Sequence, residues 1–92
     1  MCAKGCEAKS AASCALLGSM YQEGSGVEAN AATAARYYER ACELGEARGC
    51  SALGYLYFDG RGVPHDDAKG RALIEKGCKA GDTDACKVMK EL

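Results

Sequence analysis

The clearest hydrophobic pattern in the chain is a helical stripe that occurs twice. Its apolar and small residues follow the i, i+3, i+4, i+7 spacing of one helix face. The residues are Cys14, Leu17, Gly18 and Tyr21 in the first copy and Cys50, Leu53, Gly54 and Tyr57 in the second. Each copy is followed by a glycine-rich segment, residues 24–27 and 60–64, which predicts a turn because glycine permits positive φ and proline ends a helix. The pattern predicts two equivalent helices, here called A helices, around residues 14–21 and 50–57.

A second helix, here called a B helix, is expected after each turn. Asn30 in the first copy and Asp66 or Asp67 in the second are residue types that cap helix N-termini, and apolar residues follow them. A third A helix is expected after residue 78. The predicted order is A1, B1, A2, B2, A3 without any strand, so the fold class is all-α.

The chain is internally repetitive. Residues 6–41 align with residues 42–77, and residues 78–92 begin a third unit and stop halfway. Gly18 and Gly54 recur inside helices, where glycine costs about 1 kcal/mol relative to alanine. Their place on the apolar stripe predicts close helix–helix approach. We therefore expect a single domain, 1–92, of about two and a half repeats.

Six of the seven cysteines lie on the same 36-residue grid. They are Cys6, Cys14, Cys42, Cys50, Cys78 and Cys86. A continuous helix would separate residues eight apart by about 12 Å, whereas bridged Cα atoms rarely lie beyond ~7 Å. If the neighbours are bridged, the chain must reverse direction between them, and Gly45 and Gly81 lie in two of these intervals. Six cysteines alone allow about fifteen pairings.

Composition narrows the classes of function. The 92 residues carry a net charge of -1 with no long run of like charge, which argues against a nucleic-acid binder. No apolar stretch reaches the ~18 residues of a membrane span. The first residues do not form a secretory leader, and seven cysteines favour an oxidising compartment. We expect a mature, monomeric, secreted or periplasmic domain.

The chain resembles the Sel-one-like repeat family in three successive features. These are the cysteine spacing C-x7-C, the motif L-G-x-x-Y-x-x-G-x-G-V and a following helix that ends in Ala-Cys or Gly-Cys. The chain is most similar to its cysteine-bearing branch, the secreted Helicobacter cysteine-rich proteins, and residues 53–64 are the most specific stretch. The resemblance implies a tetratricopeptide-like α/α superhelix. It also implies the disulfides Cys6–Cys14, Cys42–Cys50 and Cys78–Cys86. Lys9, which replaces the glycine of the other units, makes the first turn the least typical.

Cys2 is the odd cysteine. It is expected either to be the remnant of a preceding B helix or to carry a lipid anchor as the first mature residue. Cys2, Cys6 and Cys14 could share a helix face and bind a metal. However, the chain has no C-x-x-C motif and His65 is its only histidine. We therefore predict no metal and no cofactor.

No catalytic residue is predicted. The resemblance raises penicillin binding and weak β-lactamase activity, but no serine in the chain has the lysine of a Ser-x-x-Lys motif three residues later. A mitochondrial intermembrane-space assembly factor is the other alternative, because cysteine-bearing repeats of this kind also occur there. We expect the chain to have no enzymatic activity of its own.

Binding of a protein or an extended peptide is the leading functional hypothesis, because stacked helical hairpins present a broad concave face. The stripe opposite the apolar face of the second A helix should line it, unless these are ordinary solvated residues. The candidate residues are Arg48, Ser51, Tyr55 and Asp59, with Ser19 and Lys87 at equivalent positions in the other units. Tyrosine and arginine are enriched at binding hot spots.

Overall fold

The chain folds into helices alone over the part that can be described. The computed structural model describes residues 10–91, and these form five α-helices and no strand. The helices are α1 (Ala11–Glu23), α2 (Ala31–Glu43), α3 (Ala47–Asp59), α4 (Asp67–Lys79) and α5 (Thr83–Glu91). This confirms the all-α prediction and its order, with α1, α3 and α5 as the A helices and α2 and α4 as the B helices. None of the described helices is long and apolar enough to cross a membrane.

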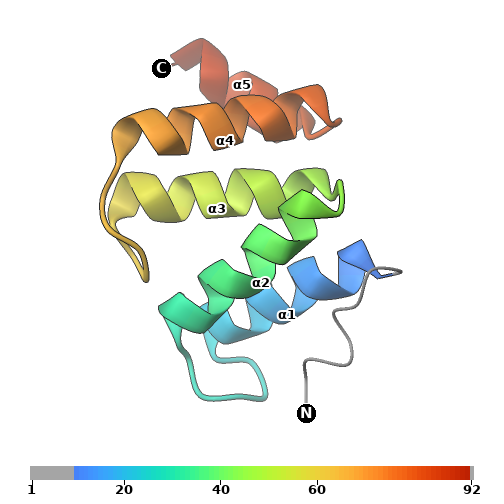
Figure 1. The fold of residues 1–92 in the computed structure, drawn as a ribbon, viewed down its shortest axis with the longest axis vertical. Coiled ribbons are helices and arrows are strands. Elements are labelled where there is room, and N and C mark those ends of the chain that lie inside the picture. Colours follow the sequence, from blue (N-terminus) through green and yellow to red (C-terminus); the bar gives the residue numbers. More distant parts are fainter. Residues whose placement is uncertain (1–9, 92) are drawn as a thin grey trace.

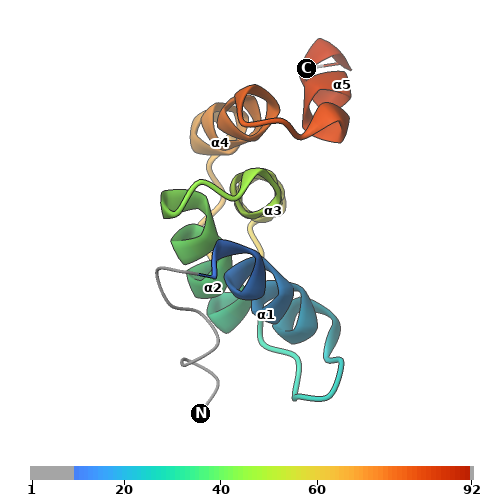
Figure 2. The ribbon, with the colours of Figure 1, turned by 90° about the vertical axis from the view of Figure 1, so that its right-hand side faces the viewer.

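The helices form a stack of two layers. In Figure 1 the chain rises from α1 and α2 through α3 and α4 to α5. Figure 2 shows α1, α3 and α5 on one side of the stack and α2 and α4 on the other. The molecule is elongated, with extents of 38 × 26 × 17 Å. This arrangement is the α/α solenoid that the sequence predicted.

The ends of the helices follow from local chemistry. The side chain of Asn30 accepts a hydrogen bond from the Thr33 N–H (3.1 Å), and Asp66 accepts one from the Lys69 N–H (3.0 Å). Each bond satisfies an N–H that has no partner within its helix. Gly24 (φ 75°) and Gly60 (φ 67°) end α1 and α3 in the left-handed conformation. Of the two aspartates considered, Asp66 is the cap, and Asp67 is the first residue of α4.

Small residues bring the helices close together. A Cβ atom placed on Gly54 would lie 2.8 Å from the carbonyl oxygen of Gly70, and one placed on Gly18 would lie 2.8 Å from the Tyr38 ring. Both glycines therefore permit an A helix to touch the following B helix, as their recurrence predicted. The central core lies next to these contacts, where Leu53 and Leu56 pack against three residues of α2. These are Ala34, Ala35 and Tyr38.

Disulfides join each B helix to the next A helix. Cys42 at the end of α2 is bonded to Cys50 in α3, with a Cα–Cα distance of 4.5 Å, and Cys78 in α4 is bonded to Cys86 in α5 (4.7 Å). The chain reverses between the partners of each pair. Cys14 is also disulfide-bonded. Its expected partner Cys6, the turn residue Lys9 and the odd cysteine Cys2 lie outside the described residues.

Candidate partner-binding surface

The surroundings of α3 show which of its residues can meet a partner. One side faces α4, where Cβ atoms on Gly54 and on Gly77 of α4 would clash across the contact. Another side faces α2 and carries Leu53 and Leu56. Between these two sides lie Arg48, Tyr55 and Asp59, of which Arg48 and Asp59 are exposed and Tyr55 is half-buried. We call these three residues the open face of α3.

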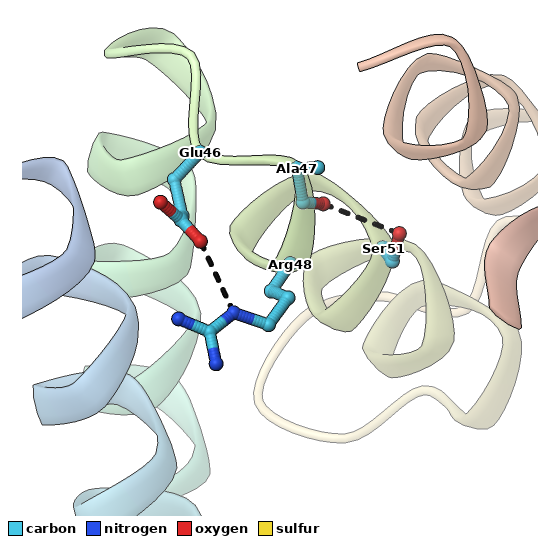
Figure 3. Close-up of polar contacts among 4 residues, drawn as sticks. All are labelled: Glu46, Ala47, Arg48 and Ser51. Carbon is cyan, nitrogen blue, oxygen red and sulfur yellow. Dashed lines mark hydrogen bonds and ion pairs between the residues drawn. The ribbon is translucent and has the colours of Figure 1, made fainter. Parts of the chain in front are cut away.

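Ser51 is not part of this face, so its prediction as a binding residue is wrong. It is only 2% exposed, and its hydroxyl donates a hydrogen bond to the Ala47 carbonyl oxygen (3.2 Å). A Cβ atom on Gly77 would collide with the Ser51 hydroxyl, which shows how tightly α4 covers this side of α3. Ser51 therefore contributes to helix packing. Figure 3 shows the side chains of Ser51 and Arg48 leaving α3 in different directions.

Arg48 extends into solvent from the first turn of α3. Its side chain is 73% exposed, and its Nε donates to the Glu46 carboxylate at 3.1 Å (Figure 3). Exposed ion pairs of this kind contribute at most about 1 kcal/mol. A partner carboxylate can therefore replace Glu46 at the guanidinium at little cost.

Tyr55 lies within electrostatic reach of two carboxylates at the start of α5. Burial, and to a smaller extent the negative charges of Asp82 and Asp84, raise the pKa of the Tyr55 phenol above its ordinary value. Asp82 accepts hydrogen bonds from the N–H groups of Asp84 (3.0 Å) and Ala85 (3.3 Å), so its carboxylate is held at the start of α5. Asp84 is exposed. The negative charges of Asp82 and Asp84 therefore act on the Tyr55 ring from the start of α5.

The remaining predicted residues have different surroundings. Asp59 is the exposed last residue of α3, and Lys87 is exposed on α5. Ser19 is half-buried, and its hydrogen bond with the Tyr38 phenol partly opposes the rise in the pKa of Tyr38, which is caused mainly by burial. The Tyr38 hydroxyl also donates to Gln22 at 2.7 Å. Ser19 is therefore engaged in contacts between α1 and α2.

Sequence reasoning missed Leu16, which is 62% exposed and is the most exposed large hydrophobic residue described. Its counterparts one and two repeats later are Ala52 and Val88, both half-buried. Comparing equivalent positions for size would have revealed it, because a large leucine stands where the next unit has alanine.

A shallow cavity of about 430 Å³ lies away from the open face of α3. It is formed by the loop between α1 and α2 together with Tyr21, and the loop contributes residues 27–30. Tyr21 also stacks on Tyr37, with ring centroids 5.6 Å apart. No group of three or more potential metal ligands occurs among residues 10–91.

The chain is similar to known repeat proteins. The Sel1 repeat model matches residues 11–46 and 47–82, which begins each unit five residues later than the cysteine-based division. Helicobacter pylori cysteine rich protein B is 36% identical, with a TM-score of 0.82 over 87% of this chain and 60% of that protein. No curated protein matches the sequence significantly.

Two other solved structures extend the comparison. A Sel1 repeat protein from Oxalobacter formigenes is 30% identical, with a TM-score of 0.83 over 86% of this chain and 32% of that protein. The protective antigen c5321 of uropathogenic Escherichia coli, which displays an SLR fold, is 32% identical, with a TM-score of 0.79 over 83% of this chain and 16% of that protein. The present chain thus spans 60% or less of the length of each of these three proteins.

Proposed function

Because the chain belongs to the Sel1 repeat family, we propose that it binds an extended segment of a partner protein across the layer formed by α1, α3 and α5. Sel1 repeats generally mediate interactions between proteins. The observation that carries the proposal is the open face of α3, where an arginine and a tyrosine remain accessible while the other sides of the helix are covered.

The residues of this face favour a particular partner chemistry. Arg48 offers a guanidinium that can exchange Glu46 for a partner carboxylate. Tyr55, on which the negative charges of Asp82 and Asp84 act, suits a basic side chain that lies on the ring. Seven residues of helix separate the Cα atoms of Arg48 and Tyr55 by about 10 Å, which an extended chain spans in about three residues. The proposed partner segment therefore carries an acidic residue, two intervening residues and then a basic one.

The disulfides also indicate where the protein works. Bonds between Cys42 and Cys50 and between Cys78 and Cys86 are typical of an oxidising compartment. The three similar structures come from bacterial proteins. These observations support a secreted or periplasmic bacterial protein. Neither the β-lactam hypothesis nor the mitochondrial one gains support from an observed contact or comparison.

The proposal is tested by selecting linear peptides from a displayed random library with the oxidised protein. We expect enrichment of acidic-x-x-basic sequences. Tyr55→Ala and Arg48→Ala should each weaken binding of a selected peptide about 10- to 30-fold, as truncation of hot-spot residues does. Arg71→Ala is the matched control, because Arg71 is exposed on α4 in the other layer. Selection of no peptide, or equal binding by all three variants, would refute this function.

A further inference from the structure

The loops that join each A helix to the following B helix are built alike in the two repeats. The backbone N–H of Asn30 donates to the carbonyl oxygen of Tyr21 at 2.9 Å, and that of Asp66 donates to the carbonyl oxygen of Tyr57 at 3.0 Å. In each pair, the residue that caps a B helix is tied to a tyrosine near the end of the preceding A helix. A side chain in the first loop can therefore be compared directly with the one 36 positions later.

In the second repeat a lysine lies over the tyrosine. The Nζ atom of Lys69 is 5.0 Å from the centre of the Tyr57 ring, which is a cation–π distance. The backbone of Lys69 is held by the helix cap, because its N–H donates to the Asp66 side chain at 3.0 Å. The equivalent N–H in the first repeat belongs to Thr33 and donates to the Asn30 side chain at 3.1 Å. Threonine thus holds the position of the lysine but has no ammonium group.

The first repeat has a cavity at this loop. Its volume is about 430 Å³, and its lining includes the side chains of Tyr21 and Glu28. Stacking on Tyr37, with ring centroids 5.6 Å apart, holds the Tyr21 ring in place. Glu28 is exposed and stands where the second loop has Pro64. The first loop therefore combines an aromatic ring with a carboxylate, two groups that attract an ammonium ion.

We propose that this cavity, here called the loop site and lined by Tyr21 and residues 27–30, binds the lysine side chain of a partner protein. Lys69 indicates the chemistry of the occupant, because it places an ammonium on the equivalent ring of the same chain. Glu28 adds an attraction that Pro64 cannot supply. Sel1 repeats generally mediate interactions between proteins, which favours a lysine over a free amine. The loop site shares no residue with the open face of α3, so either can exist without the other.

The test measures binding by heteronuclear NMR of the isotope-labelled, oxidised 92-residue protein. The probe is the tripeptide acetyl-Gly-Lys-Gly-amide, and its matched control contains norleucine, which has an alkyl chain without the ammonium group. We expect saturable chemical-shift changes at Tyr21, Glu28 and Thr33 with the lysine probe and none with the norleucine probe. Glu28→Gln should weaken binding of the lysine probe about threefold, as loss of an exposed ion pair does.

Thr33→Lys is the most direct variant, because it gives the first repeat the lysine that the second repeat has. The tethered lysine should occupy the loop site at a high effective concentration and weaken binding of the probe about fivefold. Ala32→Lys is the matched control. It adds the same charge at an adjacent exposed position of α2, and adjacent helix residues face different directions. Its binding should stay close to that of the unmodified protein, and both variants should keep the circular dichroism spectrum.

The outcomes distinguish the occupants. Absence of shift changes with the lysine probe, equal changes with the norleucine probe, or lysine binding that Thr33→Lys and Glu28→Gln leave unchanged would each overturn the proposal. A third probe, n-butylammonium, represents a free amine. We expect it to bind no more tightly than the tripeptide. Tighter binding of n-butylammonium would assign the loop site to a free amine and also overturn the proposal.

Discussion

Two leucines at the same repeat position provide a direct test of the packing. Leu53 is 5% exposed and packs against α2, whereas Leu17 in α1 is half-buried. Leu53→Ala removes a side chain that is enclosed, so it should lower the free energy of unfolding by about 3 kcal/mol, within the range for buried leucines. Leu17→Ala should cost about 1 kcal/mol, because part of that side chain is already hydrated and little cavity forms.

The pair is measured by urea unfolding and by thermal unfolding of the oxidised proteins, both followed by far-ultraviolet circular dichroism. In a domain of this size the Leu53 variant should melt about 15 °C lower and the Leu17 variant about 5 °C lower. The same residue type at the same helix position makes each variant the control for the other. Equal losses would show that the Leu17 side chain is enclosed as completely as that of Leu53, and would refute this reasoning.

The disulfides, the close helix contacts and the charges each provide a further prediction. Reduction should lower the melting temperature sharply, because each nine-residue loop closed by a disulfide contributes about 2.5 kcal/mol in the chain-entropy model; thermal unfolding with and without reductant checks this. Gly77→Ala should destabilise the fold by about 1–3 kcal/mol through its clash with the Ser51 hydroxyl, and Ser51→Ala should restore part of the loss in a double-mutant cycle. The pKa of the Tyr55 phenol is raised in the folded protein, so this group stabilises the fold at pH values below its unfolded pKa near 10. That contribution to stability is lost as the pH rises through the folded pKa of Tyr55. Asp84→Asn should lower the Tyr55 pKa, as measured by NMR titration of the ring.

The repeat made much of the fold predictable from the sequence. The stripe containing Leu53 and Gly54 located the A helix, and Asn30 and Asp66 located the starts of the B helices. These features are local, because helix periodicity and capping depend on residues a few positions apart. The close approach at Gly54 was predictable for a similar reason, since a glycine that recurs on an apolar helical stripe is typical of tight helix packing.

The limits of the binding face were not predictable from one helix alone. From the sequence, Ser51 was expected on the stripe opposite the core, but α4 covers that side of α3 and buries the serine. An A helix in this solenoid is covered on two sides by its neighbours, so its exposed strip is narrower than a single helical wheel suggests. Leu16 was missed because its exposure depends on which helix lies next to α1, a property of the stack.

The proposed function requires that a partner segment lies across the layer of α1, α3 and α5. Titration of isotope-labelled, oxidised protein with a selected acidic-x-x-basic peptide, followed by heteronuclear NMR, tests this requirement without any substitution in the chain. We expect the largest chemical-shift changes at Arg48, Tyr55 and Asp84. Changes concentrated on α2 and α4, in the opposite layer, would show that the partner binds elsewhere.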